Sequence, residues 1–167
     1  MCRIISVGGS AYNRLGFNGF DTPRVLVPGN RIPVIGEDDE RFLAKWGFPH
    51  YTNNLVFNAR AESVYACIRH GSGFWRDVLL GYVPISGFKE GGRWFALEDS
   101  KDPEPVFSLA VYDLNRSRVA LVTTVAYQPV RQFHERQLYV TLSPKFPSKF
   151  EDFFDQPLAP LSVVAGW

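Results

Sequence analysis

VFSLAVYDLNRSRVALVTTV, at residues 106–125, contains two apolar stretches separated by a short polar one. Val106–Tyr112 and Val119–Val125 are rich in β-branched residues, and the turn residues Asn115-Arg116 lie between them. This pattern predicts two strands joined by a turn. Similar stretches predict further strands at Cys2–Val7, Ile32–Ile35, Asn54–Asn58, Leu79–Ser86 and Arg93–Leu97.

Shorter segments between these strands are expected to be helical, with Ser148 as the N-cap of the last one. They are Asp38–Lys45, Glu62–Arg69, Gly73–Leu80, Val130–Arg136 and Ser148–Phe154. A second turn is expected at Gly91-Gly92. We therefore predict a compact α+β domain with a β-rich, mainly antiparallel core and short flanking helices. With no internal repeat and no linker, residues 1–167 are expected to form a single domain.

Composition excludes several classes of protein. Hydrophobic residues make up 46% of the 167 residues, which is typical of a globular chain and not of a disordered one. No apolar run is long enough to span a bilayer, and no secretory signal opens the chain. The two cysteines, Cys2 and Cys67, form no paired framework, which favours a reducing compartment. We therefore expect a cytoplasmic, soluble, monomeric protein that is not bound to a membrane.

Charge is distributed unevenly, although the net charge is only +1. Acidic residues cluster at residues 37–40 and 98–104. Seven basic residues lie in or near the motifs described below: Arg60, Arg69, Arg76, Lys89, Arg93, Arg131 and Arg136. This distribution is consistent with one basic face, which is the usual electrostatic footprint of nucleic-acid binding.

Cys2 offers chemistry that no internal cysteine has. Removal of Met1, which is normal before a small second residue, would leave an α-amine and a thiol on adjacent carbons. Such a 1,2-aminothiol condenses with an aldehyde through nitrogen to give a Schiff base, and then through sulfur to close a thiazolidine ring. The chain is therefore suited to capture a carbonyl.

Several motifs follow Cys2 in a fixed order. They are Val27–Ile35, Trp46-Gly47-Phe48-Pro49, Asn58-Ala59-Arg60-Ala61-Glu62, Pro84–Glu90 and His134-Glu135-Arg136. Together with Met1-Cys2, this series resembles the signature of the SRAP family, the SOS-response-associated peptidases or abasic-site-processing proteins. The resemblance runs from residue 1 to about residue 140, and an ordered series is more specific than any one motif.

The resemblance implies a function in the DNA damage response. A protein of this kind recognises abasic sites in single-stranded DNA and forms a covalent protein–DNA crosslink through Cys2, which shields the lesion. It would release its own Met1, which is the origin of the peptidase (hydrolase) classification, and an abasic-site lyase activity is chemically reachable through the Schiff base. The DNA would be the partner, in the nucleoid or, for a phage-encoded member, in the host cytoplasm. His50, His70 and Cys67 lack the spacing of a zinc site, so we expect no metal and no cofactor.

Four residues make chemical sense as catalytic groups: Cys2, Asn58, Glu90 and His134. Glu90 would accept the amine proton, and His134 would deliver a proton to the sugar ring oxygen as the furanose opens. Asn58 has an amide donor and acceptor to hold a hydroxyl. Four further residues are expected to contact DNA: Arg3, Trp46, Arg60 and Arg136. In this hypothesis Arg60 binds phosphate with Glu62 bracing it, and Trp46 stacks against a base.

The chain departs from the family pattern at three places. Arg3 stands where the family has glycine, Gly91 replaces a tryptophan after Glu90, and Gln137-Leu138 replace Met-Pro. Two alternative functions remain open from the sequence. One is an N-terminal-nucleophile cysteine peptidase or amidohydrolase, and the other is a non-catalytic module that binds single-stranded DNA.

Overall fold

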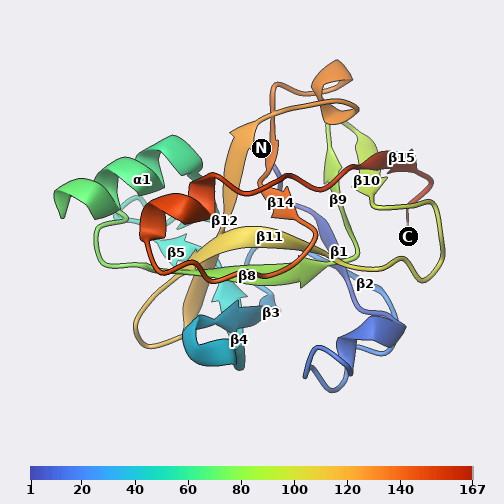
Figure 1. The fold of residues 1–167 in the computed structure, drawn as a ribbon, viewed down its shortest axis with the longest axis horizontal. Helices are drawn as coiled ribbons and strands as arrows, with labels where there is room; N and C mark the ends of the chain where they lie inside the picture. Colours follow the sequence, from blue (N-terminus) through green and yellow to red (C-terminus); the bar gives the residue numbers. More distant parts are fainter. Residues whose placement is uncertain (167) are drawn as a thin grey trace.

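The computed structural model describes residues 1–166 as strands arranged in three sheets, with one α-helix among these residues (Figure 1). The strands are β1 (Ile5–Val7), β2 (Arg24–Leu26), β3 (Arg31–Gly36), β4 (Glu40–Trp46), β5 (Phe48–Pro49), β6 (Leu55–Val56), β7 (Asn58–Arg60), β8 (Leu79–Ile85), β9 (Gly87–Glu90), β10 (Arg93–Ala96), β11 (Val106–Tyr112), β12 (Arg118–Val125), β13 (Arg136–Leu138), β14 (Val140–Thr141) and β15 (Ser162–Val164). The helical segments are α1 (Ala61–His70) and the short 3-10 turns η1 (Ser10–Tyr12), η2 (Glu37–Asp39), η3 (Val130–Gln132) and η4 (Phe150–Phe154).

The larger sheet has eight strands, and five of them pair in a closed ring: β12, β4, β3, β8 and β11. Every residue of β11 is buried, and so are the last six of β8. Continuous burial of a strand means that apolar groups cover both of its faces. The two hydrophobic stretches that begin and end VFSLAVYDLNRSRVALVTTV therefore form β11 and β12, which pair antiparallel in the core.

Strand β12 connects the core to the segments that carry the candidate motifs. It pairs in parallel with β7, so that Leu121 lies opposite Asn58 and Thr123 lies opposite Arg60. On the same strand, Val125 pairs antiparallel with Arg136 of β13. Residues from two distant motifs are thus brought to one end of β12.

The second sheet has five strands in the order β15-β10-β9-β1-β2. Antiparallel pairing sets Ile5 of β1 opposite Phe88 of β9, and the amide of Lys89 donates to the carbonyl of Ile4 at 3.0 Å. The chain before Ile4 therefore runs alongside the end of β9, where Glu90 lies. Gly91 and Gly92 form the two-residue turn to β10, with φ of 57° and 78°. Two successive positive φ values are the geometry that favours glycine in a tight hairpin.

The predicted strands agree with the structure, and the fold is β-rich with mostly antiparallel pairing. The interval Asn54–Asn58 is divided between β6 and β7, and β1 begins at Ile5 instead of Cys2. Both predicted turns, at Gly91-Gly92 and Asn115-Arg116, are present. Helix α1 confirms the prediction at Glu62–Arg69, and it ends at Gly71 in a left-handed conformation with φ of 65°.

Two of the predicted helices are wrong, and two others are confirmed only in part. Residues 40–46 form β4, because Asp38 and Asp39 adopt positive φ and turn the chain back to pair with β3. Residues 73–78 are turns that lead into β8. The predicted helix Val130–Arg136 is reduced to the 3-10 turn η3, and its last residue begins β13. The predicted helix Ser148–Phe154 is the 3-10 turn η4, whose cap position is Lys149 instead of Ser148.

Within residues 1–166, none of the helices has the length and apolar character that a bilayer crossing requires.

Candidate active site

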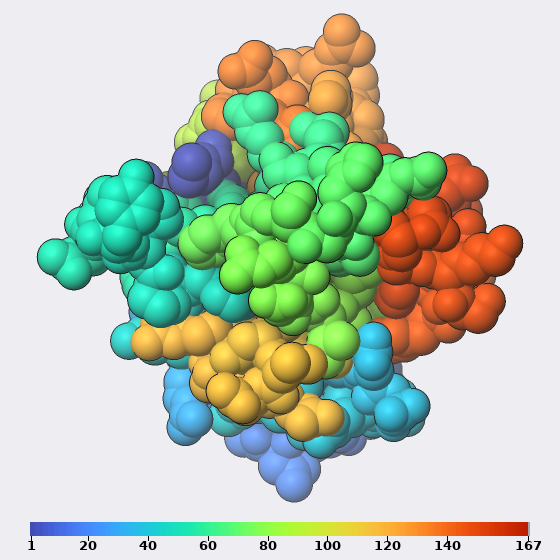
Figure 2. Space-filling view, turned by 90° about the vertical axis from the view of Figure 1, so that its left-hand side faces the viewer, coloured from blue at the N-terminus to red at the C-terminus, as the bar shows by residue number. Residues whose placement is uncertain are grey.

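A pocket of about 210 Å³ lies where the N-terminus meets β7, β9 and β12. Its lining is Met1, Asn58, Arg60, Glu90, Thr123, His134, Glu135 and Arg136. Figure 2 shows the first residues of the chain, in dark blue, at the surface beside the blue-green segment near residue 60 and below the orange segment near residue 130. Three of the four predicted catalytic residues, Asn58, Glu90 and His134, thus come together from three separate motifs.

The α-amine of Met1 is held between Glu90 and His134. It donates to Glu90 Oε1 at 3.0 Å and lies 3.3 Å from His134 Nε2. The Glu90 side chain is only 4% exposed, whereas Met1 is 65% exposed. A buried carboxylate is costly unless it is paired, and the terminal amine supplies that pairing here.

His134 can act as a proton acceptor toward this amine. Its Nδ1 lies 2.9 Å from the carbonyl oxygen of Arg136, and the amide N–H of Arg136 donates to the same nitrogen at 3.1 Å, so the two contacts belong to different tautomers of the imidazole. When Nδ1–H donates to the carbonyl, Nε2 carries the lone pair and faces the Met1 amine. In that tautomer the amine has two acceptors, a carboxylate and an imidazole, which can remove its protons.

Some residues of the pocket carry buried polar atoms that lack partners. Among residues 1–166, the buried side-chain atoms without a hydrogen-bond partner are Ser6 Oγ, Asn58 Oδ1, Glu90 Oε2 and Arg136 Nε. Three of these four belong to residues that line the pocket. Buried polar groups are normally satisfied, and an unsatisfied one costs about 1–3 kcal/mol. These atoms are themselves almost closed to the surface, so it is the residues that carry them, Asn58, Glu90 and Arg136, that line the pocket.

Cys2 is fully buried next to the pocket, and its thiol Sγ donates to the carbonyl of Ile4 at 3.5 Å. Burial raises the pKa of the Cys2 thiol well above its usual range, and the negative charge of Glu90 acts in the same direction. While Met1 precedes it, Cys2 is therefore a neutral thiol without access to solvent.

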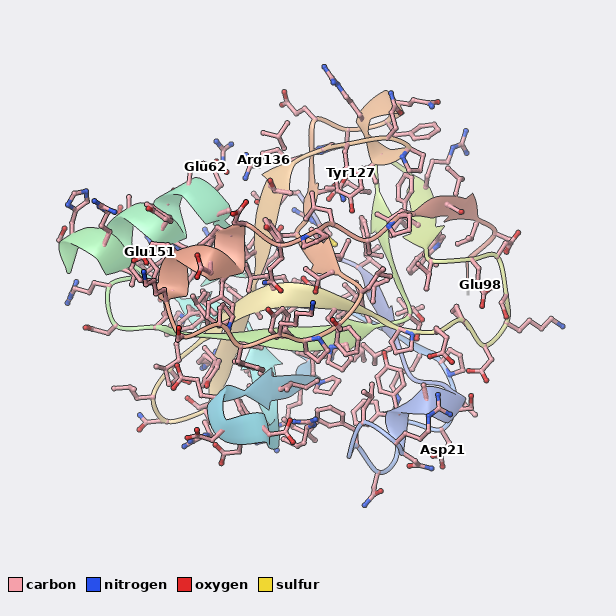
Figure 3. All side chains as sticks on the ribbon, in the orientation of Figure 1. Asp21, Glu62, Glu98, Tyr127, Arg136 and Glu151 are labelled. Carbon is pink, nitrogen blue, oxygen red and sulfur yellow. The ribbon has the colours of Figure 1, made fainter. Side chains whose placement is uncertain are left out.

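Two of the predicted DNA-contacting arginines line the pocket, but their environments differ. Arg60 is exposed, at the position that precedes α1, and no side chain of the described part of the chain pairs with its guanidinium. Arg136 donates to both carboxylate oxygens of Glu62, at 3.1 and 3.3 Å, and to the carbonyl of Thr123 at 2.9 Å. Figure 3 shows Glu62, at the start of α1, beside Arg136. The expectation that Glu62 braces Arg60 is therefore wrong, because Glu62 pairs with Arg136.

The two remaining predicted contacts lie outside the pocket. Arg3 is exposed with its guanidinium over the ring of Phe57, 5.9 Å from the ring centroid, and it lines a neighbouring hollow. Trp46 is fully buried, and its Nε1–H donates to the carbonyl of Phe57 at 2.9 Å. The stacking hypothesis for Trp46 is therefore corrected: its indole belongs to the core and has no face open to a base.

Three pocket residues were not predicted: Met1, Thr123 and Glu135. Glu135 lies inside the motif His134-Glu135-Arg136, so its two neighbours could have indicated that it belongs to the site. Thr123 is one of two threonines at the end of an apolar strand, and only the pairing with β7 brings it to the site. Across residues 1–166, no cluster of three or more histidine, cysteine, aspartate or glutamate side chains could bind a metal ion.

Gly91 fixes the position of the Phe133-His134 segment. A Cβ on Gly91 would lie 2.5 Å from the carbonyl oxygen of Phe133, whereas a Cβ on Gly92 would meet nothing within 4 Å. Both glycines have positive φ, so alanine at either position lowers the free energy of unfolding by roughly 1–2 kcal/mol. We expect Gly91→Ala to lower the free energy of unfolding by roughly 1–3 kcal/mol more than Gly92→Ala does, because only Gly91→Ala displaces Phe133. Urea unfolding of the two variants measures the difference. Equal losses of unfolding free energy would mean that the Phe133-His134 segment can move aside without cost.

Comparison with known proteins gives the fold but not the family. No protein-family model matches the chain, and no curated protein matches it either. The structure is similar to the crystal structure of a phage-related protein from Bordetella bronchiseptica, with a TM-score of 0.58 and 16% sequence identity. The match covers 84% of this chain and 78% of that one. At this identity the likeness shows a shared fold alone.

Proposed function

We propose that this protein captures abasic sites in single-stranded DNA, by a covalent bond to Cys2 once Met1 has been removed. The capture joins the DNA to the protein as a thiazolidine and shields the lesion, as in the SRAP family that the motif order resembles. The activity is that of an abasic-site crosslinking protein, with the excision of Met1 as its associated peptidase step.

One observation carries the proposal. Asn58, Glu90 and His134 are far apart in the sequence, and they line one pocket with the terminal α-amine between two of them. A pocket with a positioned amine, proton acceptors and arginines suits the attack of an amine on the aldehyde of a sugar phosphate. The exposed guanidinium of Arg60 favours the binding of an anionic ligand.

Four residues of the site have a role in this chemistry. The Cys2 amine attacks the aldehyde carbon, and Glu90 or His134 takes the proton that the amine loses. Water leaves as the imine forms, and the Cys2 thiol then adds to the imine carbon to close the ring. The side-chain amide of Asn58, which lines the pocket, would hold a hydroxyl of the opened sugar.

In the form that retains Met1, the buried thiol weighs against a cysteine peptidase that acts through Cys2. Such an enzyme needs a thiolate, and burial raises the pKa of the Cys2 thiol in the chain that still carries Met1. The aldehyde reaction begins instead at the amine, which does not require a thiolate. A binding module without chemistry would have no use for an amine positioned between a buried carboxylate and an imidazole.

The direct test is the intact mass of the protein after incubation with abasic single-stranded DNA. We expect the chain that begins at Cys2 to gain the mass of the oligonucleotide minus one water, in a bond that survives denaturant. An undamaged oligonucleotide of the same sequence should add no mass. Absence of the adduct from a folded, Cys2-initiated chain would contradict the proposal.

Salt dependence tests the role of Arg60. Contacts to phosphates release counterions, so the logarithm of affinity falls with the logarithm of salt concentration by roughly 0.7 for each phosphate on a single strand. We expect Arg60→Ala to weaken binding at low salt and to reduce this slope by about 0.7. The matched control is Arg69→Ala. Arg69 is also exposed, but it lies at the far end of α1, where its guanidinium donates to the hydroxyl of Tyr65. An unchanged slope in Arg60→Ala would assign Arg60 a structural role.

A further inference from the structure

The structure indicates what the site does before Met1 is removed. The Met1 amine already occupies the position between Glu90 Oε1, at 3.0 Å, and His134 Nε2, at 3.3 Å. It is a primary amine in the same pocket, beside Asn58, Arg60 and Arg136. Its proton acceptors are therefore those that we assign to the Cys2 amine.

The thiol cannot finish the reaction in this form. Cys2 Sγ is fully buried and bonded to the carbonyl of Ile4. An imine on the Met1 nitrogen would also be separated from Cys2 Sγ by a planar peptide bond. Ring closure would then require an eight-membered ring in place of the five-membered thiazolidine, and a trans peptide opposes such a ring.

We infer that the chain that retains Met1 is a strand-cleaving abasic-site lyase, whereas the chain that begins at Cys2 is a crosslinker. This inference rests on the proposed function, because both forms act on the same aldehyde in the same pocket. The identity of the first residue thus decides whether the strand is cut or shielded.

The lyase reaction balances without an oxidant or reductant. The Met1 nitrogen bonds to the aldehyde carbon and one water leaves, which gives an imine. Glu90 or His134 then takes a proton from the sugar C2, and the electron pair of that C–H bond forms the C2–C3 double bond. The C3–O bond breaks, and the 3′ phosphate leaves with its strand. Water finally hydrolyses the imine, which releases the unsaturated aldehyde and restores the amine.

The test compares two chains that differ only in their first residue. Each is made as an N-terminal fusion and is released in vitro by a protease that leaves no extra residue, so that one begins at Met1 and the other at Cys2. The uncut Met1 fusion, in which an amide blocks the amine, is the control. All three are incubated with abasic single-stranded DNA, with and without borohydride, and analysed by denaturing gel and intact mass. Circular dichroism verifies that all three are folded.

We expect the Met1 chain to cleave the strand at least about tenfold faster than the Cys2 chain or the uncut fusion, which is within the range of a positioned proton-transfer site. It should form a stable adduct only with borohydride, and peptide mapping should place that adduct on Met1. A Met1 chain that neither cleaves nor is trapped, beside a Cys2 chain that crosslinks, overturns the inference and leaves the proposed function intact. Trapping on a lysine such as Lys89, or loss of Met1 during the incubation, also overturns it. If neither chain reacts, the proposed function fails as well.

Discussion

Cys2→Ala is expected to form no denaturant-stable adduct with abasic single-stranded DNA, which is a complete loss of the proposed activity. In this variant the terminal amine remains and can form an imine, but no thiol is present to close the ring. The imine hydrolyses in water, so only borohydride should capture it. Intact mass and a denaturing gel, each with and without borohydride, separate the two kinds of bond.

Two controls isolate the requirement for amine and thiol on one residue. Cys67→Ala should crosslink at the parent rate, because Cys67 lies on α1 and does not line the pocket. A chain with one extra residue between Met1 and Cys2, which keeps the thiol but ties the Cys2 amine into an amide, should form no thiazolidine. A thiol-only mechanism, as in a cysteine hydrolase, would be indicated if this extended chain crosslinked as well as the Cys2-initiated one.

Glu90→Gln and His134→Ala are expected to slow crosslinking by about 10- to 10,000-fold, the range typical of general acid–base catalysis. Each substitution removes one of the two proton acceptors that lie within 3.3 Å of the Met1 amine and that we assign to the Cys2 amine once Met1 has been removed. Because glutamine has nearly the shape of glutamate, Glu90→Gln should change the chemistry more than the packing. Single-turnover rates at saturating DNA measure the effect apart from binding.

Matched substitutions elsewhere control for the loss of a carboxylate or an imidazole. Glu98 is exposed and lies far from Arg136 in Figure 3, and His70 is exposed at the end of α1. Glu98→Gln and His70→Ala should therefore crosslink at the parent rate. DNA affinity should change little in any of the four variants, since the arginines are untouched. Parent rates in both Glu90→Gln and His134→Ala would show that the assigned proton transfers are wrong.

The strands of the core could be predicted because their burial is nearly continuous. Residues 106–112 and 119–123 are all buried, so each strand appears in the sequence as an apolar run. Strand β4 has a different pattern, with Leu43 exposed and only Ala44 and Trp46 fully buried. Its acidic beginning and mixed polarity match a helix equally well. Pairing with β3 decides between the two, and a single segment does not contain that information.

The site could be predicted where a residue's role depends on its chemistry, and not where it depends on orientation. The order of the motifs together with their functional groups predicts Asn58, Glu90 and His134, and these residues share the pocket. Trp46 was chosen for its aromatic ring, but its strand directs that ring into the core. The pairing of Arg136 with Glu62 depends on how α1 lies against β13, which no local pattern specifies.

The wide sequence separation of the pocket residues has a consequence for protein synthesis. The terminal amine leaves the ribosome first, yet its contacts are with residues 89 and 133 positions further along the chain. Domains generally fold as units once their sequence has emerged. A nascent chain therefore exposes a bare N-terminus that has no assembled pocket around it until the segment containing His134 has been translated. Under the proposed function, the catalysed capture of an aldehyde therefore begins only after the segment that contains His134 has been translated.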